Sequence, residues 1–211
     1  MIFETHAHYD DEKFKEDREQ LVSSLPEQNI KRVINVGADF AGCVDSVALA
    51  EKYDYIYAAI GIHPSNIEDA TEENLAWIKG KASWEKTVAI GEIGLDYYWD
   101  KEPTVQQAQR EMFCRQLALA KEMSLPVIIH SRDAAEDTMN IMQQAHKDGI
   151  PVIISSGVFC NLYTGYKSLD DLLQLSSMKF PVQKRCQIHS QFKSNIHLVK
   201  LASIVSFLQI F

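Results

Sequence analysis

The sequence predicts an incomplete α/β barrel of the TIM-barrel, (β/α)8, type, with about five to six strand–helix units. Strand-like and helix-like stretches alternate along the first part of the chain, which is the pattern of an α/β fold. The strand-like stretches are continuous apolar runs, as expected for a parallel sheet covered by helices. Ionisable side chains follow the ends of different strands. A barrel gathers such ends into one ring, whereas a doubly wound sheet spreads them along a line.

The apolar runs predict strands at residues 1–8, 32–37, 55–63, 87–96, 125–133 and 150–155. Between them, the patterns predict helices at about residues 15–28, 38–53, 71–82, 105–123 and 134–149. Thr71 is expected to cap the third helix, because its hydroxyl can accept a hydrogen bond from a free N–H group of the first turn. Gly149 is expected to end the fifth helix.

Composition limits the possible functions. The chain has 211 residues and a formal net charge of −8, which argues against nucleic-acid binding through a broad basic surface. An enzyme acting on phosphodiesters is not excluded, because a metal site supplies local positive charge. The start lacks a signal-peptide pattern and no apolar run is long enough to cross a bilayer. A cytoplasmic, monomeric protein without membrane association is expected. Its four separated cysteines are expected to stay reduced: Cys43, Cys114, Cys160 and Cys186.

Two histidines open a candidate metal site. His6 and His8 lie two residues apart in the first strand, so both can point to one face. Glu92 follows in an apolar strand between Gly91 and Gly94, which allow close backbone approach or an irregular strand end. A carboxylate there can bridge two divalent ions, and hydrolytic metal sites use such nitrogen and oxygen ligands.

Four further side chains stand near strand ends. His130 ends the fifth strand and can add an imidazole ligand, while His63 and Asp96 can orient ligands or substrate. Arg132 is a candidate phosphate clamp, because its planar fork suits a pair of phosphate oxygens. The alternatives are a turn histidine at position 63, a hydrogen-bonded core histidine at 130, and an arginine paired with a surface acid. The aromatic stretch 96–100 lines either a nucleotide or sugar pocket or packs at the barrel rim.

Five segments carry a family resemblance: FETHAHYDD, NVGAD, AAIGIHP, AIGEIGLDYYWD and QLALAKEMSLPVIIHSRDA. They resemble the TatD family of metal-dependent deoxyribonucleases, within the amidohydrolase-like barrels, from residue 1 to about 150. The resemblance implies a TIM barrel, two divalent ions (Mg, Mn or Zn), and hydrolysis of phosphodiester bonds in DNA, either single-stranded or at 3′ ends. It makes His6 and His8 the first metal pair, Glu92 the bridging carboxylate that helps to activate water, and His130 a ligand of the second ion. Glu4 stands where the family usually has aspartate, which is a mild change.

The resemblance to these motifs ends near residue 151. The family continues with an HCFSG-like strand end that supplies another metal histidine, and with an ETDAP-like segment whose aspartate ligates metal and acts as general base. This chain has VIISSGVFCNLYTG at the first place and nothing like ETDAP, so the general-base aspartate is not found. Residues 1–151 carry 27 of the 29 acidic side chains. The sequence therefore predicts a partial TatD-like barrel over residues 1–151 and a divergent tail over 152–211, produced by truncation or a frameshift, with natural divergence as the alternative.

Three functions follow as alternatives. The first is a metal-dependent nuclease, for which the missing aspartate and histidine predict little or no turnover by this chain. The second is a catalytically inactive partial barrel that acts at most as a weak metal-binding or interaction protein. The third is another amidohydrolase-type reaction, because the same metal ligands serve several substrates.

Overall fold

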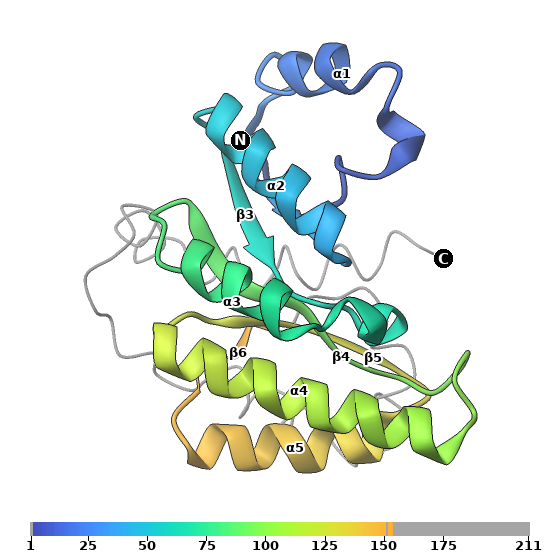
Figure 1. Ribbon diagram of the computed structural model, residues 1–211. Helices are drawn as coiled ribbons and strands as arrows, with labels where there is room; N and C mark the ends of the chain where they lie inside the picture. The colour runs from blue at the N-terminus through green and yellow to red at the C-terminus, as the bar shows by residue number, and fades with distance from the viewer. Residues whose placement is uncertain (1, 151, 154–211) are drawn as a thin grey trace. The chain divides into compact units, whose positions relative to one another are not determined.

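The computed structural model describes residues 2–150 and 152–153, so almost all of the predicted tail lies outside the described residues. Strands and helices alternate along the described chain (Figure 1). The strands are β1 (Ile2–Ala7), β2 (Ile30–Val36), β3 (Ile56–Ile60), β4 (Thr87–Asp96), β5 (Val127–Arg132) and β6 (Val152–Ile153). The helices are α1 (Arg18–Ser24), α2 (Phe40–Lys52), α3 (Glu72–Lys81), α4 (Pro103–Met123) and α5 (Ala135–Lys147), with 3-10 turns η1 (Glu12–Phe14) and η2 (Pro64–Asp69).

The strands form one parallel sheet in the order β1-β2-β3-β4-β5-β6. Every connection therefore steps to the next strand in the same direction. A doubly wound sheet reverses direction at a switch point, whereas a (β/α) barrel does not. The strand order distinguishes the two folds that the apolar pattern alone leaves open.

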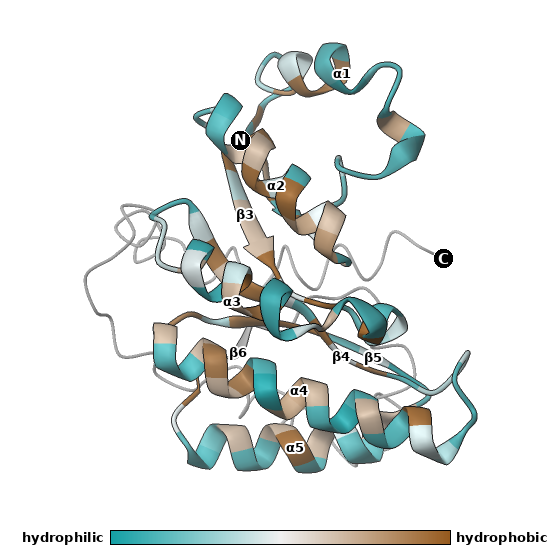
Figure 2. Ribbon diagram, viewed as in Figure 1, coloured by the Kyte–Doolittle hydropathy of each residue, from teal (hydrophilic) through white to brown (hydrophobic). Residues whose placement is uncertain are grey.

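The helices cover one face of this sheet. The larger apolar cluster joins strand residues such as Ile56 and Ile129 with helix residues such as Val47 and Phe113. The smaller cluster contains only strand residues in the described chain: Val36, Ala59, Ala89 and Ile128, with Ile34 against them. The helices carry bands of both apolar and polar residues, as expected when one side is covered (Figure 2). Among the described residues, the helices pack on one face of the sheet and the other face carries only strand side chains, as on the outside and inside of a barrel wall, so the predicted partial barrel is confirmed.

Strand alternation places the candidate site on the inner face. Ala7 packs against the helix-facing cluster, so its neighbours His6 and His8 face the other way. In β4 the register with β5 shifts between Ile90 and Ile93, both of which lie in the helix-facing cluster. Two residues instead of one therefore fit between them, and this irregularity turns Glu92 inward.

Several predicted boundaries are confirmed and one helix is shorter than expected. Thr71 Oγ1 accepts a hydrogen bond from Asn74 N at 3.2 Å, and Gly149 follows α5 with a φ of 78°. The first helix spans Arg18–Ser24 rather than residues 15–28. Pro26 causes the early end, because proline has no N–H group and its ring clashes with the preceding turn. No helix among the described residues is long and apolar enough to cross a membrane.

Candidate metal centre

The first group of the site joins β1 to β4. His6 Nε2 lies 3.0 Å from His8 Nε2 and 3.3 Å from Glu92 Oε2, and His8 Nε2 lies 4.0 Å from the same oxygen. His8 Nδ1 donates a hydrogen bond of 2.7 Å to the carbonyl of Val36 at the end of β2. In the neutral imidazole the Nε2 atom of His8 therefore carries a lone pair, and this lone pair is directed toward the other two side chains.

Curvature of the sheet makes this group possible. β1 and β4 are three strands apart in the sheet order. In a flat sheet three strand spacings amount to about 14 Å, and the side chains of one face stand parallel to one another. The 3.3 Å contact between His6 and Glu92 therefore requires a sheet that curls so that its inward side chains converge.

The second group lies on β4 and β5. Glu92 Oε1 is 3.4 Å from His130 Nδ1, and His130 Nε2 bonds to Asp96 Oδ2 at 3.0 Å. The bond to Asp96 holds the proton on Nε2, which leaves Nδ1 as a lone-pair donor toward Glu92. All three side chains are less than a tenth exposed. Asp96 thus orients His130, as the sequence analysis expected of a supporting carboxylate.

Glu92 is held as a carboxylate between the two groups. Burial of Glu92 opposes its ionisation. When His130 and His6 are protonated, however, their hydrogen bonds to the carboxylate and their positive charge outweigh burial and hold the pKa of Glu92 well below the ordinary value. One oxygen faces His6 and the other faces His130.

His63 lies beside His130, with 4.1 Å between the ring centroids. Its Nδ1 accepts a hydrogen bond of 3.1 Å from Ser65 N in the turn η2, so the neutral ring carries its proton on Nε2. Burial, and next the positive potential of His130, lower the pKa of His63 to about 4. His63, Glu92 and His130 are close enough to share an ion. The bond from Ser65, however, makes Nε2 of His63 a hydrogen-bond donor rather than a ligand.

Arg132 does not join this cluster. Its guanidinium carbon lies 3.9 Å from the ring centroid of Tyr98 and 5.3 Å from that of Trp99. Within the described part of the chain, the guanidinium of Arg132 packs on these two aromatic rings and makes no salt bridge with an acid.

Two glutamines support the site and were missed by the sequence analysis. Gln109 of α4 accepts a hydrogen bond from Asp96 N at 2.9 Å and donates to Asp96 O at 3.2 Å and to Asp100 Oδ2 at 2.7 Å. Further along the same buried face of α4, Gln116 makes the same pair of hydrogen bonds with the backbone N–H and carbonyl of Ile62, which precedes His63. The signal was present, since the two glutamines are seven residues apart in register with the buried apolar residues of the helix.

Asn35 is a third supporting residue that was missed. It is fully buried on β2, accepts from Tyr9 N at 2.7 Å and donates to Asp10 Oδ1 at 2.6 Å and Ser46 Oγ at 2.8 Å. These bonds fix the chain directly after His8. A buried amide in an apolar strand is the sequence signal, because an unpaired polar group there is costly.

The donor set fits a divalent cation. Imidazole nitrogens and carboxylate oxygens suit zinc and the first-row divalent metals. Two nitrogens that each lie about 2.1 Å from one ion are about 3.0 Å apart when they meet it at a right angle, and the two Nε2 atoms of His6 and His8 are 3.0 Å apart. His6, His8 and Glu92 can therefore hold one ion, and Glu92 with His130 offers part of a second position.

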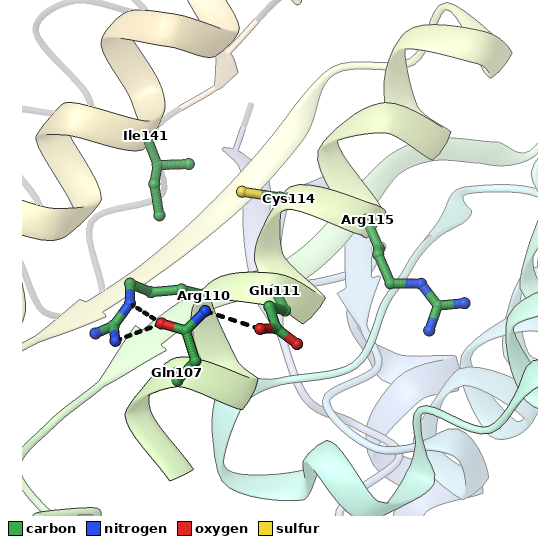
Figure 3. A pocket seen from close by; sticks show the side chains of 6 residues that line it. All are labelled: Gln107, Arg110, Glu111, Cys114, Arg115 and Ile141. Atoms are coloured by element: carbon green, nitrogen blue, oxygen red, sulfur yellow. Dashed lines mark hydrogen bonds between the residues drawn. The ribbon is translucent and has the colours of Figure 1, made fainter. Parts of the chain in front are cut away.

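A surface depression lies between α4 and α5, and none of the candidate metal ligands lines it. Figure 3 shows its side chains: Gln107, Arg110, Glu111, Cys114, Arg115 and Ile141. Gln107 bonds there to both Arg110 and Glu111, so these polar groups satisfy one another. The depression contains no converging set of metal ligands, which leaves the strand ends as the candidate site of the described residues.

Comparisons with known proteins agree with this site. The sequence model of the family described as TatD related DNase matches residues 3–175, which extends beyond the boundary expected at 151. The "uncharacterized metal-dependent hydrolase YabD" of Bacillus subtilis is 45% identical over 150 residues, which are 71% of this chain and 58% of YabD. The "3′-5′ ssDNA/RNA exonuclease TatD" of Erwinia tasmaniensis is 29% identical over 165 residues, covering 78% of this chain and 61% of that protein.

A solved structure supports the fold. The crystal structure of YJJV, a TatD homolog from Escherichia coli K12, superposes with a TM-score of 0.69 at 28% identity, over 83% of this chain and 65% of that one. The chain spans little more than half the length of the curated relatives YabD and YjjV, at 58% and 51%. Because the family match covers most of the sequence and the sheet is wound as in a solved homologue, we conclude that this chain belongs to the TatD family of metal-dependent hydrolases.

Proposed function

We propose that the strand-end cluster is the divalent-metal centre of a hydrolase of phosphodiester bonds in nucleic acid. The observation that carries this proposal is the convergence of His6, His8 and His130 on the two oxygens of Glu92. The exonuclease name of the Erwinia relative supports single-stranded DNA or RNA as the substrate class.

Each residue has a role in this proposal. His6, His8 and Glu92 would hold one divalent ion, and Glu92 and His130 would help to hold a second. The ions, when bound, neutralise negative charge on the phosphate and activate water. Asp96 keeps His130 in the tautomer whose Nδ1 faces Glu92, and Nε2–H of His63 donates to a substrate oxygen. The cytoplasmic location and monomeric state expected from the sequence stay predictions.

A second candidate follows from the sequence beyond residue 151. The family resemblance places a second-metal histidine shortly after residue 151, where this chain has VIISSGVFCNLYTG without a histidine. Because this ligand is missing from its expected position, turnover by this chain is expected to be low, and metal binding without catalysis is the alternative function.

Calorimetric titration with Mn²⁺ tests the metal centre. We expect the wild-type chain and His146→Ala, which changes an exposed histidine on α5, to bind equally. His6→Ala and Glu92→Gln are expected to weaken binding at least tenfold, because each removes a ligand. Equal binding by all four proteins would overturn the metal centre.

Cleavage of a single-stranded DNA oligonucleotide with Mn²⁺ or Mg²⁺ then separates the two candidates. His6-dependent cleavage supports the nuclease, and binding without cleavage supports the inactive metal-binding barrel. Turnover as fast as that of a full-length family member would refute the expectation of low activity.

A further inference from the structure

An aromatic pair stands next to the metal centre with no role in it. Tyr98 and Trp99, which follow β4, are 43% and 66% exposed, so they are among the most exposed large apolar side chains of the described residues. Their rings meet edge to face, with 4.6 Å between centroids and 87° between planes. Adjacent exposed aromatic side chains of this size beside a candidate metal site point to a binding surface.

Two cations border the aromatic pair. The guanidinium of Arg132 lies against the ring of Tyr98, and Lys101 Nζ is 5.6 Å from the same ring centroid. The side chain of Arg132 makes no hydrogen bond to another described residue, so its N–H groups can bind a ligand oxygen while its flat face stays on Tyr98. A surface with both exposed rings and unpaired cations matches an anionic ligand that also has a flat face.

The turn that carries the pair is fixed to the metal centre through one side chain. Asp96 Oδ1 accepts hydrogen bonds from Tyr98 N at 3.0 Å and Trp99 N at 3.4 Å, while its Oδ2 holds His130. Gln109 anchors the same turn through Asp96 and Asp100. The aromatic pair is therefore positioned by the carboxylate that orients a proposed metal ligand, and both are expected to contact one substrate.

From this arrangement we propose a nucleobase-stacking subsite formed by Tyr98, Trp99 and Arg132. Trp99 stacks on an unpaired base of single-stranded nucleic acid, and Arg132 binds the phosphate of the same or the next nucleotide. The proposal rests on the proposed function for its ligand class and adds the place where a base is bound. Stacking on an aromatic face is tolerant of base identity, so the subsite selects single strands rather than a sequence.

Binding of a fluorescently labelled oligothymidylate tests the subsite without catalysis. The measurement is fluorescence anisotropy of the full chain in EDTA at low salt, so that neither metal binding nor cleavage contributes. We expect Trp99→Ala to weaken binding about 5- to 100-fold, and Trp99→Phe to retain most of it because a ring remains. Val44→Ala, which shortens another exposed apolar side chain, is the matched control and is expected to bind as the wild type does.

An oligonucleotide with abasic positions identifies the contact. If Trp99 stacks on a base, the wild type loses affinity for the abasic oligonucleotide, whereas Trp99→Ala loses little more, because the same interaction is already absent. Arg132→Gln should weaken both ligands equally, while Arg115→Gln, which changes an exposed arginine paired with Glu72, should weaken neither.

Three results would overturn the subsite: no binding by the wild type, equal binding by Trp99→Ala and Val44→Ala, or equal binding of abasic and normal oligonucleotides by the wild type. The proposed function is tested separately: it fails if Mn²⁺ binding, measured by calorimetry, does not depend on His6. A base-stacking surface without a metal centre, and a metal centre without base stacking, are therefore distinguishable.

Discussion

At position 94 the backbone of β4 has a φ of +148°, which side chains rarely allow. A Cβ atom there would lie 1.9 Å from the carbonyl oxygen of His130, and one at Gly91 would lie 2.8 Å from that of Ile128. Both glycines let β4 lie against β5 around Glu92. The sequence-based expectation of close backbone approach is thus confirmed, and the reason is the neighbouring strand that carries His130.

Gly94→Ala is therefore expected to lower the free energy of unfolding by at least about 3 kcal/mol, from backbone strain and overlap with β5. Urea denaturation measures the change. Gly80→Ala is the matched control, because a Cβ at that position in α3 meets nothing within 4 Å. It should stabilise the protein by about 0.5–1 kcal/mol, since alanine favours helix over glycine. Similar losses for both variants would contradict the proposed cause.

At the scale of elements, α4 acts as a brace for two strand ends. Its buried face combines apolar residues that pack on the sheet with two glutamines that bond to backbone groups just after β3 and at the end of β4. Each glutamine satisfies one N–H and one carbonyl of a residue at the strand end, as a neighbouring strand would. The helix thus fixes the backbone beside His63 and at Asp96, where the strands stop pairing.

Gln109→Met tests this brace, because it keeps the volume and removes the hydrogen bonds. The unfolding free energy should fall by about 2–4 kcal/mol, since buried backbone groups of Asp96 lose their partner. Mn²⁺ affinity, measured by calorimetry, should fall about 10- to 100-fold if Asp96 positions His130. Gln107→Met, on the exposed side of α4, should change neither quantity. A lower unfolding free energy with unchanged Mn²⁺ affinity would show that Gln109 supports the fold but does not position the metal ligand.

At the scale of the molecule, the candidate metal centre joins the first strand of the described sheet to its fourth and fifth strands. His6 lies in β1 and His8 directly follows it, while Glu92 lies in β4 and His130 in β5. A bound ion would therefore couple the N-terminal strand to the middle of the chain. Because such a site forms only when the sheet is curled, binding favours the folded state over the unfolded state.

Mn²⁺ at about 100 times its dissociation constant should add about 2.7 kcal/mol to stability. For a chain of this size that corresponds to a rise in Tm on the order of 5–10 °C, measured by circular dichroism and reversed by EDTA. His8→Ala should abolish the rise, while His146→Ala should retain it. An equal rise in both variants would place the binding elsewhere.

The sequence by itself determined the fold class and the candidate ligands. Continuous apolar runs defined the strands. Ionisable residues at their ends were the candidate ligands, because burying such a group is costly unless it is paired or binds a metal: His6, His8, Glu92 and His130. It also identified Asp96 as a supporting residue, since a carboxylate at a strand end can hold a histidine ligand.

Only the tertiary structure decided how these residues meet. The irregularity in β4 turns Glu92 inward, the bond from Ser65 sets the tautomer of His63, and the guanidinium of Arg132 stacks on the ring of Tyr98. The hydrogen bonds from Gln109 and Gln116 to the backbone at the strand ends are likewise visible only in the tertiary structure. Local patterns fix which face a side chain takes in a regular strand, but contacts between segments far apart in sequence depend on register and curvature, which no single segment encodes.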